Sequence, residues 1–373
     1  MDKMYRYRGT QKLRCGYATG TCAAAAAGAA AMWLLQGTAE EQIAVLLPSG
    51  ERLTIPVSPV SCTVDSAVCS VAKDSGDDPD VTNGITVCAK IEKTAEGMEI
   101  IGGEGIGTVT KPGLDQPVGA WAINSVPRRM IAAALQETAE QSGYTGGFRV
   151  TISVPGGEAL AARTYNPRMG IVGGISIIGT SGIVEPMSSA ALVDTIRIEA
   201  TMRRAEGETR LLLTLGNYSE QFLRLHLPYS PEQSVQCSNF IGDALDIGVS
   251  LGFTEILLVG HVGKLVKLGA GIMNTHSAQA DGRMETLVTC GVLAGADPAV
   301  LRQLPDCVTV DAALEILRNA GCLEPTMSVL TERIAYHLQH RVKNAVRTSA
   351  ILFSFQHDKV WTSGSVQDLM SHK

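Results

Sequence analysis

Apolar runs, glycines and helical segments follow one another in a regular order in the second half of the chain. The runs at 211–215 and 256–259 each end in a glycine, and segments with helical apolar spacing follow at 238–251 and 262–272. This repeated order predicts a parallel sheet whose two faces are covered by helices. The same spacing predicts further helices at 188–204, 284–294, 311–320 and 327–343, and a late strand at 349–355.

The first half of the chain shows short strand patterns around an alanine-rich helix. In the segment 16–37, Thr19 or Thr21 can cap this helix and Gly37 can end it. The turn Pro48-Ser49-Gly50 predicts a hairpin between 43–47 and 52–57. Further strands are expected at 60–71, 85–91, 99–101, 148–154 and 171–179, and a second helix at 127–142.

These patterns predict two domains. Residues 1–185 form an α+β domain with the alanine-rich helix at its start, and residues 186–373 form a Rossmann-like, doubly wound, three-layer α/β domain with C-terminal helices and a late strand. The length of 373 residues agrees with about two domains. A hydrophobic content of 45% with 18% charged residues excludes a disordered chain.

Composition narrows the classes of partner and the compartment. The net charge of −6 argues against a nucleic-acid binder that relies on an overall positive field. Nine cysteines without a CxxC pair indicate reduced thiols rather than disulfides or a zinc site. The basic N-terminus before the alanine run is similar to a secretory signal, but the run is shorter than the roughly 20 residues that span a bilayer. We therefore expect a cytoplasmic protein with no membrane partner.

Glycine-rich turns mark the places where a ligand can approach the backbone. Open α/β sheets bind ligands at the carboxyl ends of their strands, so turns that follow strands are candidates for a nucleotide-like or adenosyl ligand. The candidate residues are Gly179, Thr180, Ser181, Gly182, Gly216, Asn217, Tyr218, Gly260, His261 and Gly263. A phosphate loop at 260–264 is incomplete, because two residues separate its glycines and Leu265 follows the lysine, which argues against ATP hydrolysis.

Basic residues beside prolines and glycines form a second set of candidates. Guanidinium and ammonium groups on rigid loops suit carboxylates or phosphates, although surface residues near turns give the same pattern. This set consists of Lys111, Arg128, Arg129, Arg168, Lys264 and Lys267. The start of the alanine helix, with Thr19 and Thr21, is either an anion site or a purely structural helix end. The aspartate-rich stretch at 73–84 is either a solvated turn or a ligand or metal contact.

Several long motifs make the sequence resemble the cobalt-precorrin-5B methyltransferase family of the anaerobic cobalamin pathway. These motifs are GYATGTCAAAAA from Gly16, KDSGDDPDVTNG from Lys73, GTVTKPGL from Gly107, NSVPRRMI from Asn124, ISVPGGE from Ile152, YNPRMGIVGGISIIGTSGIVEPMS from Tyr165, SNFIGDALD from Ser238 and LLVGHVGKLVKLGAGIMNTHSAQADGRME from Leu257. The departures are Ala18 in place of a threonine, Gly28 in place of a lysine and Ser219 in place of a glycine.

The resemblance implies an S-adenosylmethionine-dependent methyltransferase that methylates carbon 1 of cobalt-precorrin-5B to give cobalt-precorrin-6A. The tetrapyrrole substrate carries many carboxylates, for which the six basic residues and the two threonines are the expected ligands. If a proton must be moved, His261 is the first candidate and Asp281 the second. The cobalt comes with the substrate, so no protein metal site is expected. A non-catalytic tetrapyrrole carrier or scaffold is the alternative function, and a homo-oligomer is left open.

Overall fold

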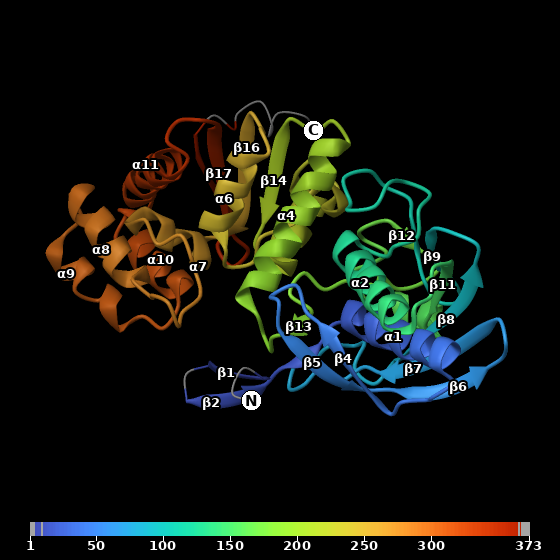
Figure 1. The fold of residues 1–373 in the computed structure, drawn as a ribbon. Coiled ribbons are helices and arrows are strands. Elements are labelled where there is room, and N and C mark those ends of the chain that lie inside the picture. The colour runs from blue at the N-terminus through green and yellow to red at the C-terminus, as the bar shows by residue number, and fades with distance from the viewer. Residues whose placement is uncertain (1–3, 9, 365, 367–373) are drawn as a thin grey trace. The chain divides into compact units, whose positions relative to one another are not determined.

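The computed structural model describes residues 4–8, 10–364 and 366 of the chain. The chain divides into two compact units, Met1–Ser189 and Ala190–Lys373, and each has its own hydrophobic core. Both units combine helices with sheets, so the protein is a mixed α/β structure (Figure 1).

The main sheet of the first unit has the strand order β6-β7-β8-β11-β9. Its neighbouring strands are antiparallel except for β11 and β9, which are parallel. The elements of this unit are β1 Tyr5–Arg8, β2 Gln11–Arg14, β3 Gly16–Tyr17, α1 Thr19–Gln36, β4 Gln42–Leu46, β5 Arg52–Pro56, β6 Ser58–Cys62, β7 Ser66–Ala72, β8 Thr86–Thr94, β9 Met98–Gly102, β10 Thr108–Val109, α2 Ser125–Ser142, β11 Gly147–Ser153, α3 Gly157–Ala161, β12 Ile171–Val172 and β13 Ile183–Val184.

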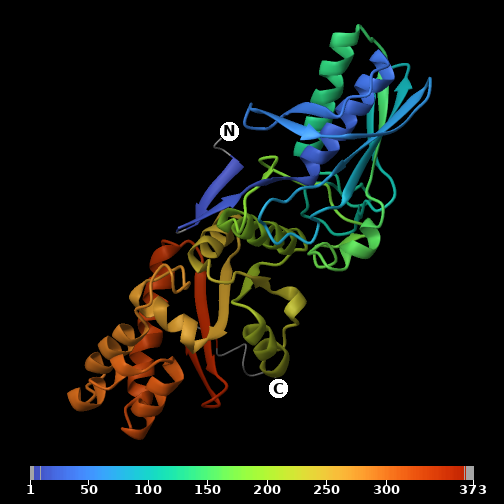
Figure 2. The ribbon, with the colours of Figure 1, turned by 90° about the horizontal axis from the view of Figure 1, so that it is seen from below.

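Helix α1 lies at the centre of the first unit and is buried along almost its whole length. It packs against α2 on one side and against β7, β8 and β4 on others, and Figures 1 and 2 both show the two helices side by side. A Cβ atom at Gly28 would lie 2.9 Å from Ile43 Cδ1 and 3.4 Å from Ala134 Cβ. The small side chains therefore allow the close packing that keeps this helix inside the core. In the part of the chain that the structure describes, no helix is both long and apolar enough to cross a membrane.

The second unit is built on a sheet with the order β15-β14-β16-β17-β18. The first four strands are parallel and β18 is antiparallel to β17. The elements of this unit are α4 Ser189–Ala205, β14 Arg210–Thr214, α5 Asn217–His226, β15 Val235–Gln236, α6 Ile241–Ser250, β16 Glu255–His261, α7 Val262–Leu265, α8 Arg283–Leu293, α9 Pro298–Leu301, α10 Val310–Asn319, α11 Leu323–Arg341, β17 Arg347–Ser354 and β18 Lys359–Ser363, with short 3₁₀ turns at Pro231–Gln233, Val266–Ala270 and Leu304–Asp306.

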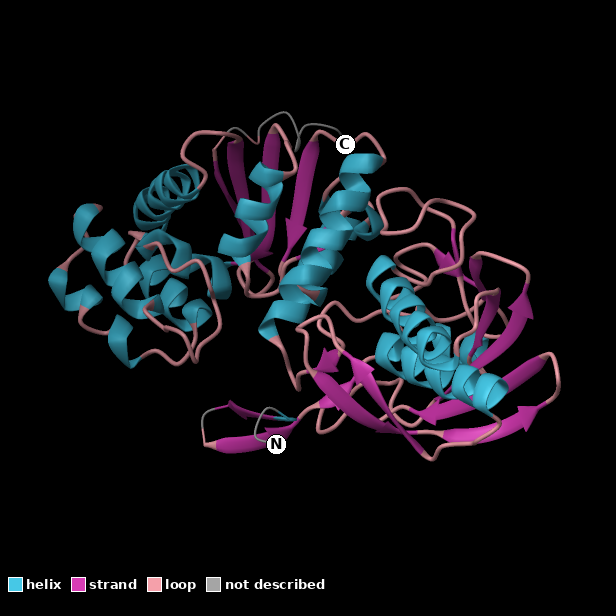
Figure 3. Cartoon of the chain, viewed as in Figure 1, coloured by secondary structure: helices cyan, strands magenta, loops and turns pink. Residues whose placement is uncertain are grey.

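Helices cover both faces of this second sheet. Alternate residues of the strands point to opposite faces, and one set, which includes Leu213 and Leu258, packs in a core with α4, α6 and α11. The other set, which includes Leu212 and Leu257, packs against Phe222 of α5. Figure 3 shows α4 and α6 crossing the strands on one face, and Figures 1 and 2 show α8, α9 and α10 gathered at one end of the unit. The Rossmann-like assignment itself stays a prediction.

Most of the predicted elements are present in the structure. The hairpin is confirmed by the antiparallel pair β4 and β5, and the late strand corresponds to β17. The alanine-rich helix ends as expected at Gly37, which has a φ of 77° and donates its N–H to the carbonyl of Trp33.

Two predicted strands are wrong. The segment expected at 60–71 is broken into β6 and β7, because Thr63 N–H bonds to the Ser66 carbonyl and reverses the chain. The segment expected at 171–179 is reduced to β12 and isolated bridges of Ile175 and Ile177. The sequence patterns also missed α5, β15 and β18.

Candidate functional site

A pocket of about 780 Å³ opens at the carboxyl ends of the parallel strands of the second unit. Small-molecule sites typically occupy roughly 300–1,000 Å³. The chain leaves β14 toward one edge of the sheet and β16 toward the other, and this reversal is where open α/β sheets bind ligands. The pocket is lined by Leu215, Gly216, Asn217, Tyr218, Ser219, His261, Gly263, Lys264, Asp311, Phe355 and Gln356.

The turn after β14 presents bare backbone to the pocket. Gly216 has φ 140° and ψ −166°, a conformation that is essentially restricted to glycine. Of the described residues beyond the glycine's chain neighbours, only Gln236 would lie within 4 Å of a Cβ atom there, with its Nε2 at 3.6 Å, so the space above the turn is open. Ser219 closes the turn, because its Oγ accepts a hydrogen bond from Leu215 N–H at 3.3 Å. A glycine at position 219 would have no hydroxyl, so this hydrogen bond depends on the serine.

His261 lies at the end of β16 and caps α7. Its Nδ1 accepts a hydrogen bond from Gly263 N–H at 3.1 Å, which places the proton of the neutral ring on Nε2. Burial lowers the pKa of His261, although the nearby Asp311 carboxylate opposes this shift. His261 is therefore a neutral N–H donor in the pocket, and the lone pair that a general base needs is already used. This geometry argues against the predicted role of His261 as a proton acceptor.

Two oppositely charged side chains share the pocket. Lys264 lies on α7, and burial lowers the pKa of its ammonium group. The Asp311 carboxylate lies near the start of α10, where Oδ1 accepts a hydrogen bond from Ser354 Oγ at 2.6 Å. Its Oδ2 lies 3.9 Å from His261 Nε2, too far for a hydrogen bond.

Aromatic rings form one wall of the pocket. Tyr218 is 69% exposed and Phe355 39% exposed, and their ring centroids lie 6.4 Å apart. The buried ring of Phe353 supports Phe355 at 5.0 Å and contacts the edge of His261 at 5.6 Å. The structure thus gathers exposed rings that are too sparse in the sequence to suggest a stacking surface.

Gly260 does not line this pocket. It lies inside β16, where a Cβ atom would be 2.9 Å from Leu215 Cδ1 and 3.0 Å from Leu265 Cγ. The strand and the following helix need this glycine for close packing, so the structure gives no support to the predicted cofactor contact at Gly260.

The predicted turn at Gly179, Thr180, Ser181 and Gly182 belongs to the first unit and is not among the residues that line this pocket. It packs on the start of α1, where a Cβ atom at Gly179 would lie 2.5 Å from Ala18 Cβ. The Gly182 carbonyl accepts hydrogen bonds from Ala18 N–H and from Thr21 Oγ.

The threonines at the start of α1 do not cap it. Ala18 is the N-cap and supplies no side-chain hydrogen bond. Thr19 Oγ1 bonds to the carbonyl and N–H of Ile178, and Thr21 Oγ1 donates to the Gly182 carbonyl. Both threonines are buried. The predicted cap is therefore wrong, and both hydroxyls are bonded to backbone groups of the chain, which favours the structural interpretation of this helix end.

Neither Lys267 nor Asp281 lines the pocket: Lys267 is buried, and Asp281 is exposed and paired with Arg283. The buried Lys267 ammonium donates to the carbonyls of Thr275 and Ala280 at 3.1 and 2.7 Å, so it is held by the backbone of its own chain, and this geometry argues against the predicted role of Lys267 as an anion ligand. Asp281 accepts two hydrogen bonds from Arg283, and this pairing lowers the pKa of the carboxyl group. A carboxylate stabilised in this way is a poor proton acceptor, which removes the argument for Asp281 as a base.

Three loops of the first unit bring the remaining basic residues into one region. Thr110 bonds to the Gly170 carbonyl through its N–H and its hydroxyl, and the Lys111 stem lies against Gly170. This contact joins the loops that carry Lys111 and Arg168. Asp115 accepts hydrogen bonds from Gln116 and from the backbone N–H of Ser125, the first residue of α2.

Arg128 and Arg129 follow on the first turns of α2, and the charge of Arg129 acts on Asp115. Burial raises the pKa of Asp115, but the hydrogen bonds from Gln116 and Ser125 and the charge of Arg129 together lower it overall. Arg128 donates through Nε to the Ile123 carbonyl at 2.8 Å and through Nη1 to the Ile100 carbonyl at 3.0 Å. Arg129 is exposed. Arg128 is thus partly structural, whereas Arg129 faces solvent.

The aspartate-rich loop is held by internal charge pairs. Lys73 is buried, and its Nζ lies 2.5 Å from both Asp80 Oδ2 and Ser75 Oγ. Asp74 pairs with Arg14. Within residues 4–8, 10–364 and 366, no group of three or more histidine, cysteine or acidic residues could hold a metal ion. All nine cysteines are free thiols in the structure.

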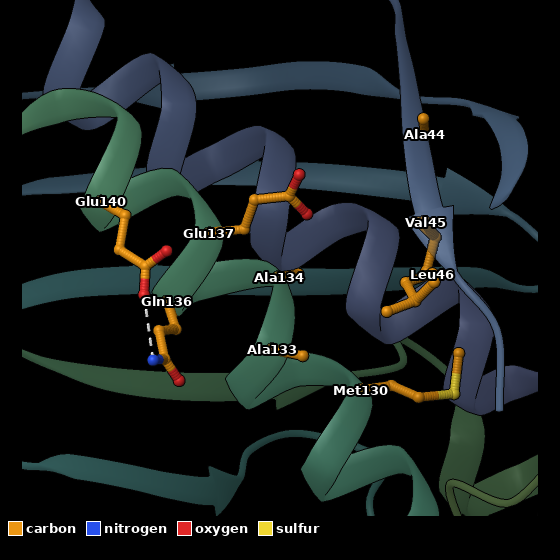
Figure 4. Close-up of a pocket in the computed structure, with 9 residues that line it drawn as sticks. All are labelled: Ala44, Val45, Leu46, Met130, Ala133, Ala134, Gln136, Glu137 and Glu140. Atoms are coloured by element: carbon orange, nitrogen blue, oxygen red, sulfur yellow. Dashed lines mark hydrogen bonds between the residues drawn. The ribbon is translucent and has the colours of Figure 1, made fainter. Parts of the chain in front are cut away.

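A smaller hollow of about 260 Å³ lies between β4 and α2. Figure 4 shows Leu46 of β4 extending toward α2, which carries Met130, Ala133 and Ala134, while Glu137 and Glu140 lie farther along the same helix. Since its only charged lining residues are acidic, this hollow does not suit a polyanionic ligand.

Sequence reasoning missed five pocket residues, namely Leu215, Ser219, Asp311, Phe355 and Gln356. Leu215 and Ser219 directly flank the predicted turn Gly216-Asn217-Tyr218. Phe355 and Gln356 directly follow β17, so the same signal that marked the turns after β14 and β16 could have found them. Asp311 gives no such signal, because the start of α10 reaches the pocket only through tertiary packing on α7.

The fold and the pocket define an α/β protein with a hollow of ligand size at the carboxyl ends of parallel strands. The CbiD family matches residues 6–186, and the CbiD C-terminal domain matches residues 274–364. The chain belongs to the CbiD family, which confirms the family predicted from the motifs.

Relatives along nearly the full length carry one name. A protein of Ruminiclostridium cellulolyticum, named cobalt-precorrin-5B C(1)-methyltransferase, is 43% identical over 95% of this chain and 94% of its own length. A protein of Photorhabdus laumondii with the same name is 41% identical over 96% and 95%. A solved structure of a cobalamin biosynthesis protein (CbiD) from Archaeoglobus fulgidus is 30% identical, covers 75% of this chain and 88% of that one, and has a TM-score of 0.42.

Proposed function

We propose that the chain is an S-adenosylmethionine-dependent methyltransferase that converts cobalt-precorrin-5B into cobalt-precorrin-6A by methylating carbon 1, in anaerobic cobalamin biosynthesis. The observation that carries this proposal is the pocket at the strand ends of the second unit. Relatives that match nearly the full length of the chain are named as this methyltransferase, which supports the same proposal. We propose that the second unit is Rossmann-like, because of its strand order and because helices cover both faces of its sheet. The free thiols support a cytoplasmic location.

The chemistry of the pocket fits an adenosyl sulfonium. A Cβ atom would fill the open cradle above Gly216, where backbone can approach a ligand closely. The rings of Tyr218 and Phe355 offer faces on which an adenine can stack. His261 presents its Nε2–H as a hydrogen-bond donor. When bound, S-adenosylmethionine supplies a methyl group that is already activated for transfer.

The residues of the chain then have binding and orienting roles. Because the methyl group is already activated and the accepting ring carbon is electron-rich, alignment of the two is the main requirement, and no general base is needed for the transfer itself. The structure is consistent with this, because both base candidates are already engaged: His261 with Gly263 and Asp281 with Arg283. We propose that the basic loops with Lys111, Arg129 and Arg168 bind carboxylates of the tetrapyrrole.

Calorimetry with the full chain tests the proposal. We expect binding of S-adenosylmethionine and of S-adenosylhomocysteine, and label transfer from methyl-labelled donor to cobalt-precorrin-5B. ATP with Mg²⁺ is the control ligand and is expected not to bind. Binding of the tetrapyrrole without any binding of S-adenosylmethionine would contradict the proposal and favour a carrier or scaffold.

A further inference from the structure

Asp311 is fixed in place, but among the residues that the structure describes it has no hydrogen-bonded cationic partner. Ser354 Oγ holds Oδ1 at 2.6 Å, and the backbone carbonyl of Asp311 lies 2.9 Å from His357 Nε2. Its side chain is only 16% exposed, and within the described residues Oδ2 accepts no hydrogen bond. A carboxylate that is largely removed from water and has no cationic partner is unfavourable unless a ligand supplies one.

Lys264 is the complementary case in the same pocket. It is half-buried on α7, which packs against α10, the helix that carries Asp311. Across the part of the chain that the structure describes, its ammonium group forms no hydrogen bond or ion pair, and it does not pair with Asp311. The pocket therefore holds a separated negative and positive charge on neighbouring helices, each available to a ligand.

An α-amino acid carries the matching pair of charges, an ammonium and a carboxylate on one carbon atom. Neutral ligands such as an adenine or a ribose do not need either protein charge. A tetrapyrrole with many carboxylates would be repelled by Asp311. The charges in the pocket thus fit the amino-acid end of a donor better than any other part of the two proposed ligands.

We propose, resting on the methyltransferase function above, that Asp311 and Lys264 bind the amino-acid end of S-adenosylmethionine. Asp311 Oδ2 accepts a hydrogen bond from the donor's ammonium group, and Lys264 Nζ donates one to its carboxylate. This assignment moves Lys264 from the tetrapyrrole site, where the sequence placed it, to the donor site.

Four ligands separate these contacts by calorimetry on the full chain. S-adenosylmethionine and S-adenosylhomocysteine carry both charges of the amino acid, decarboxylated S-adenosylmethionine lacks the carboxylate, and 5′-methylthioadenosine lacks the whole amino acid. Hydrogen bonds between charged groups are among the strong ones. Asp311→Asn should therefore lower the affinity for S-adenosylmethionine and S-adenosylhomocysteine by roughly 10- to 100-fold, and leave the affinity for 5′-methylthioadenosine unchanged. Lys264→Met should weaken the same two ligands and leave the decarboxylated donor unchanged.

The control is Asp306→Asn, which removes one exposed carboxylate near α10 and should change none of these affinities. Unchanged binding of 5′-methylthioadenosine also shows that each variant is folded. Equal loss for all ligands, or loss for S-adenosylmethionine but not for S-adenosylhomocysteine, would overturn the assignment of Asp311. If Lys264→Met loses tetrapyrrole binding but keeps its affinity for all four adenosyl ligands, the assignment of Lys264 to the donor's carboxylate is overturned. If the wild-type chain binds none of the adenosyl ligands, the proposed function itself fails.

Discussion

Arg128 and Arg129 are adjacent in sequence but should respond differently to the same substitution. The Arg128 guanidinium is half-buried and bonds to two backbone carbonyls, those of Ile123 and Ile100. These contacts tie α2 to the loop before it and to β9. Arg129 is exposed. Arg128→Gln should therefore weaken the first unit, whereas Arg129→Gln should leave its stability unchanged.

The magnitude follows from the two hydrogen bonds. A hydrogen bond that involves a charged group contributes about 1.5–3 kcal/mol, and partial exposure reduces this, so Arg128→Gln should cost about 2–4 kcal/mol. In a unit of this size, 1 kcal/mol lowers Tm by about 2–4 °C, so the expected drop is about 5–15 °C. Arg129→Gln should stay within about 0.5 kcal/mol of the wild type.

Thermal unfolding followed by circular dichroism measures both variants, and steady-state kinetics measures KM for the tetrapyrrole. We expect Arg129→Gln to raise KM with an unchanged Tm, since it removes one cation from the proposed substrate region. An unchanged Tm in Arg128→Gln would refute the structural role of its guanidinium. An unchanged KM in Arg129→Gln would remove that residue from the substrate site.

Three other perturbations probe separate parts of the molecule. Gly179→Ala should destabilise the first unit by about 2–5 kcal/mol in urea unfolding, because the added Cβ meets Ala18 Cβ at 2.5 Å and the φ of 142° is strained. Phe355→Ala should lower the affinity for S-adenosylmethionine and for 5′-methylthioadenosine equally, by about tenfold, since both ligands have the adenine that stacks on the ring. Although burial raises the pKa of Asp80, the hydrogen bonds from Lys73 and Thr82 lower it overall. The stabilisation from this carboxylate is therefore complete above its unfolded pKa near 3.8 and is lost as the pH falls through the lower folded value, so acid unfolding should be less steep in Asp80→Asn.

Controls make these outcomes specific. Gly143→Ala also has a positive φ, but its Cβ meets nothing within 4 Å, so it should cost only about 1–2 kcal/mol. An equal loss in the two glycine variants would contradict the steric argument at Gly179. Unchanged affinity for both adenosyl ligands in Phe355→Ala, or an unchanged acid transition in Asp80→Asn, would count against those two assignments.

The local sequence determined the main helices and the strand-end turns of this protein. Continuous apolar runs that end in glycine marked β14 and β16 correctly, because both faces of a parallel sheet are buried. The long motifs determined the family. The alanine run determined a helix that could be buried on all sides, since small side chains permit close packing.

The tertiary structure decided which candidates meet in one site. Lys267 and Lys264 are three residues apart and have the same charge, yet one is bonded to buried carbonyls and the other faces the pocket. The turn at 179–182 looks like the turns after β14 and β16, but it packs on α1. Asp311 lies near His261, from which it is 50 positions away in sequence, because α10 packs on α7. Spacing along the chain carries no record of such contacts, because they depend on how whole elements bury their apolar faces against one another.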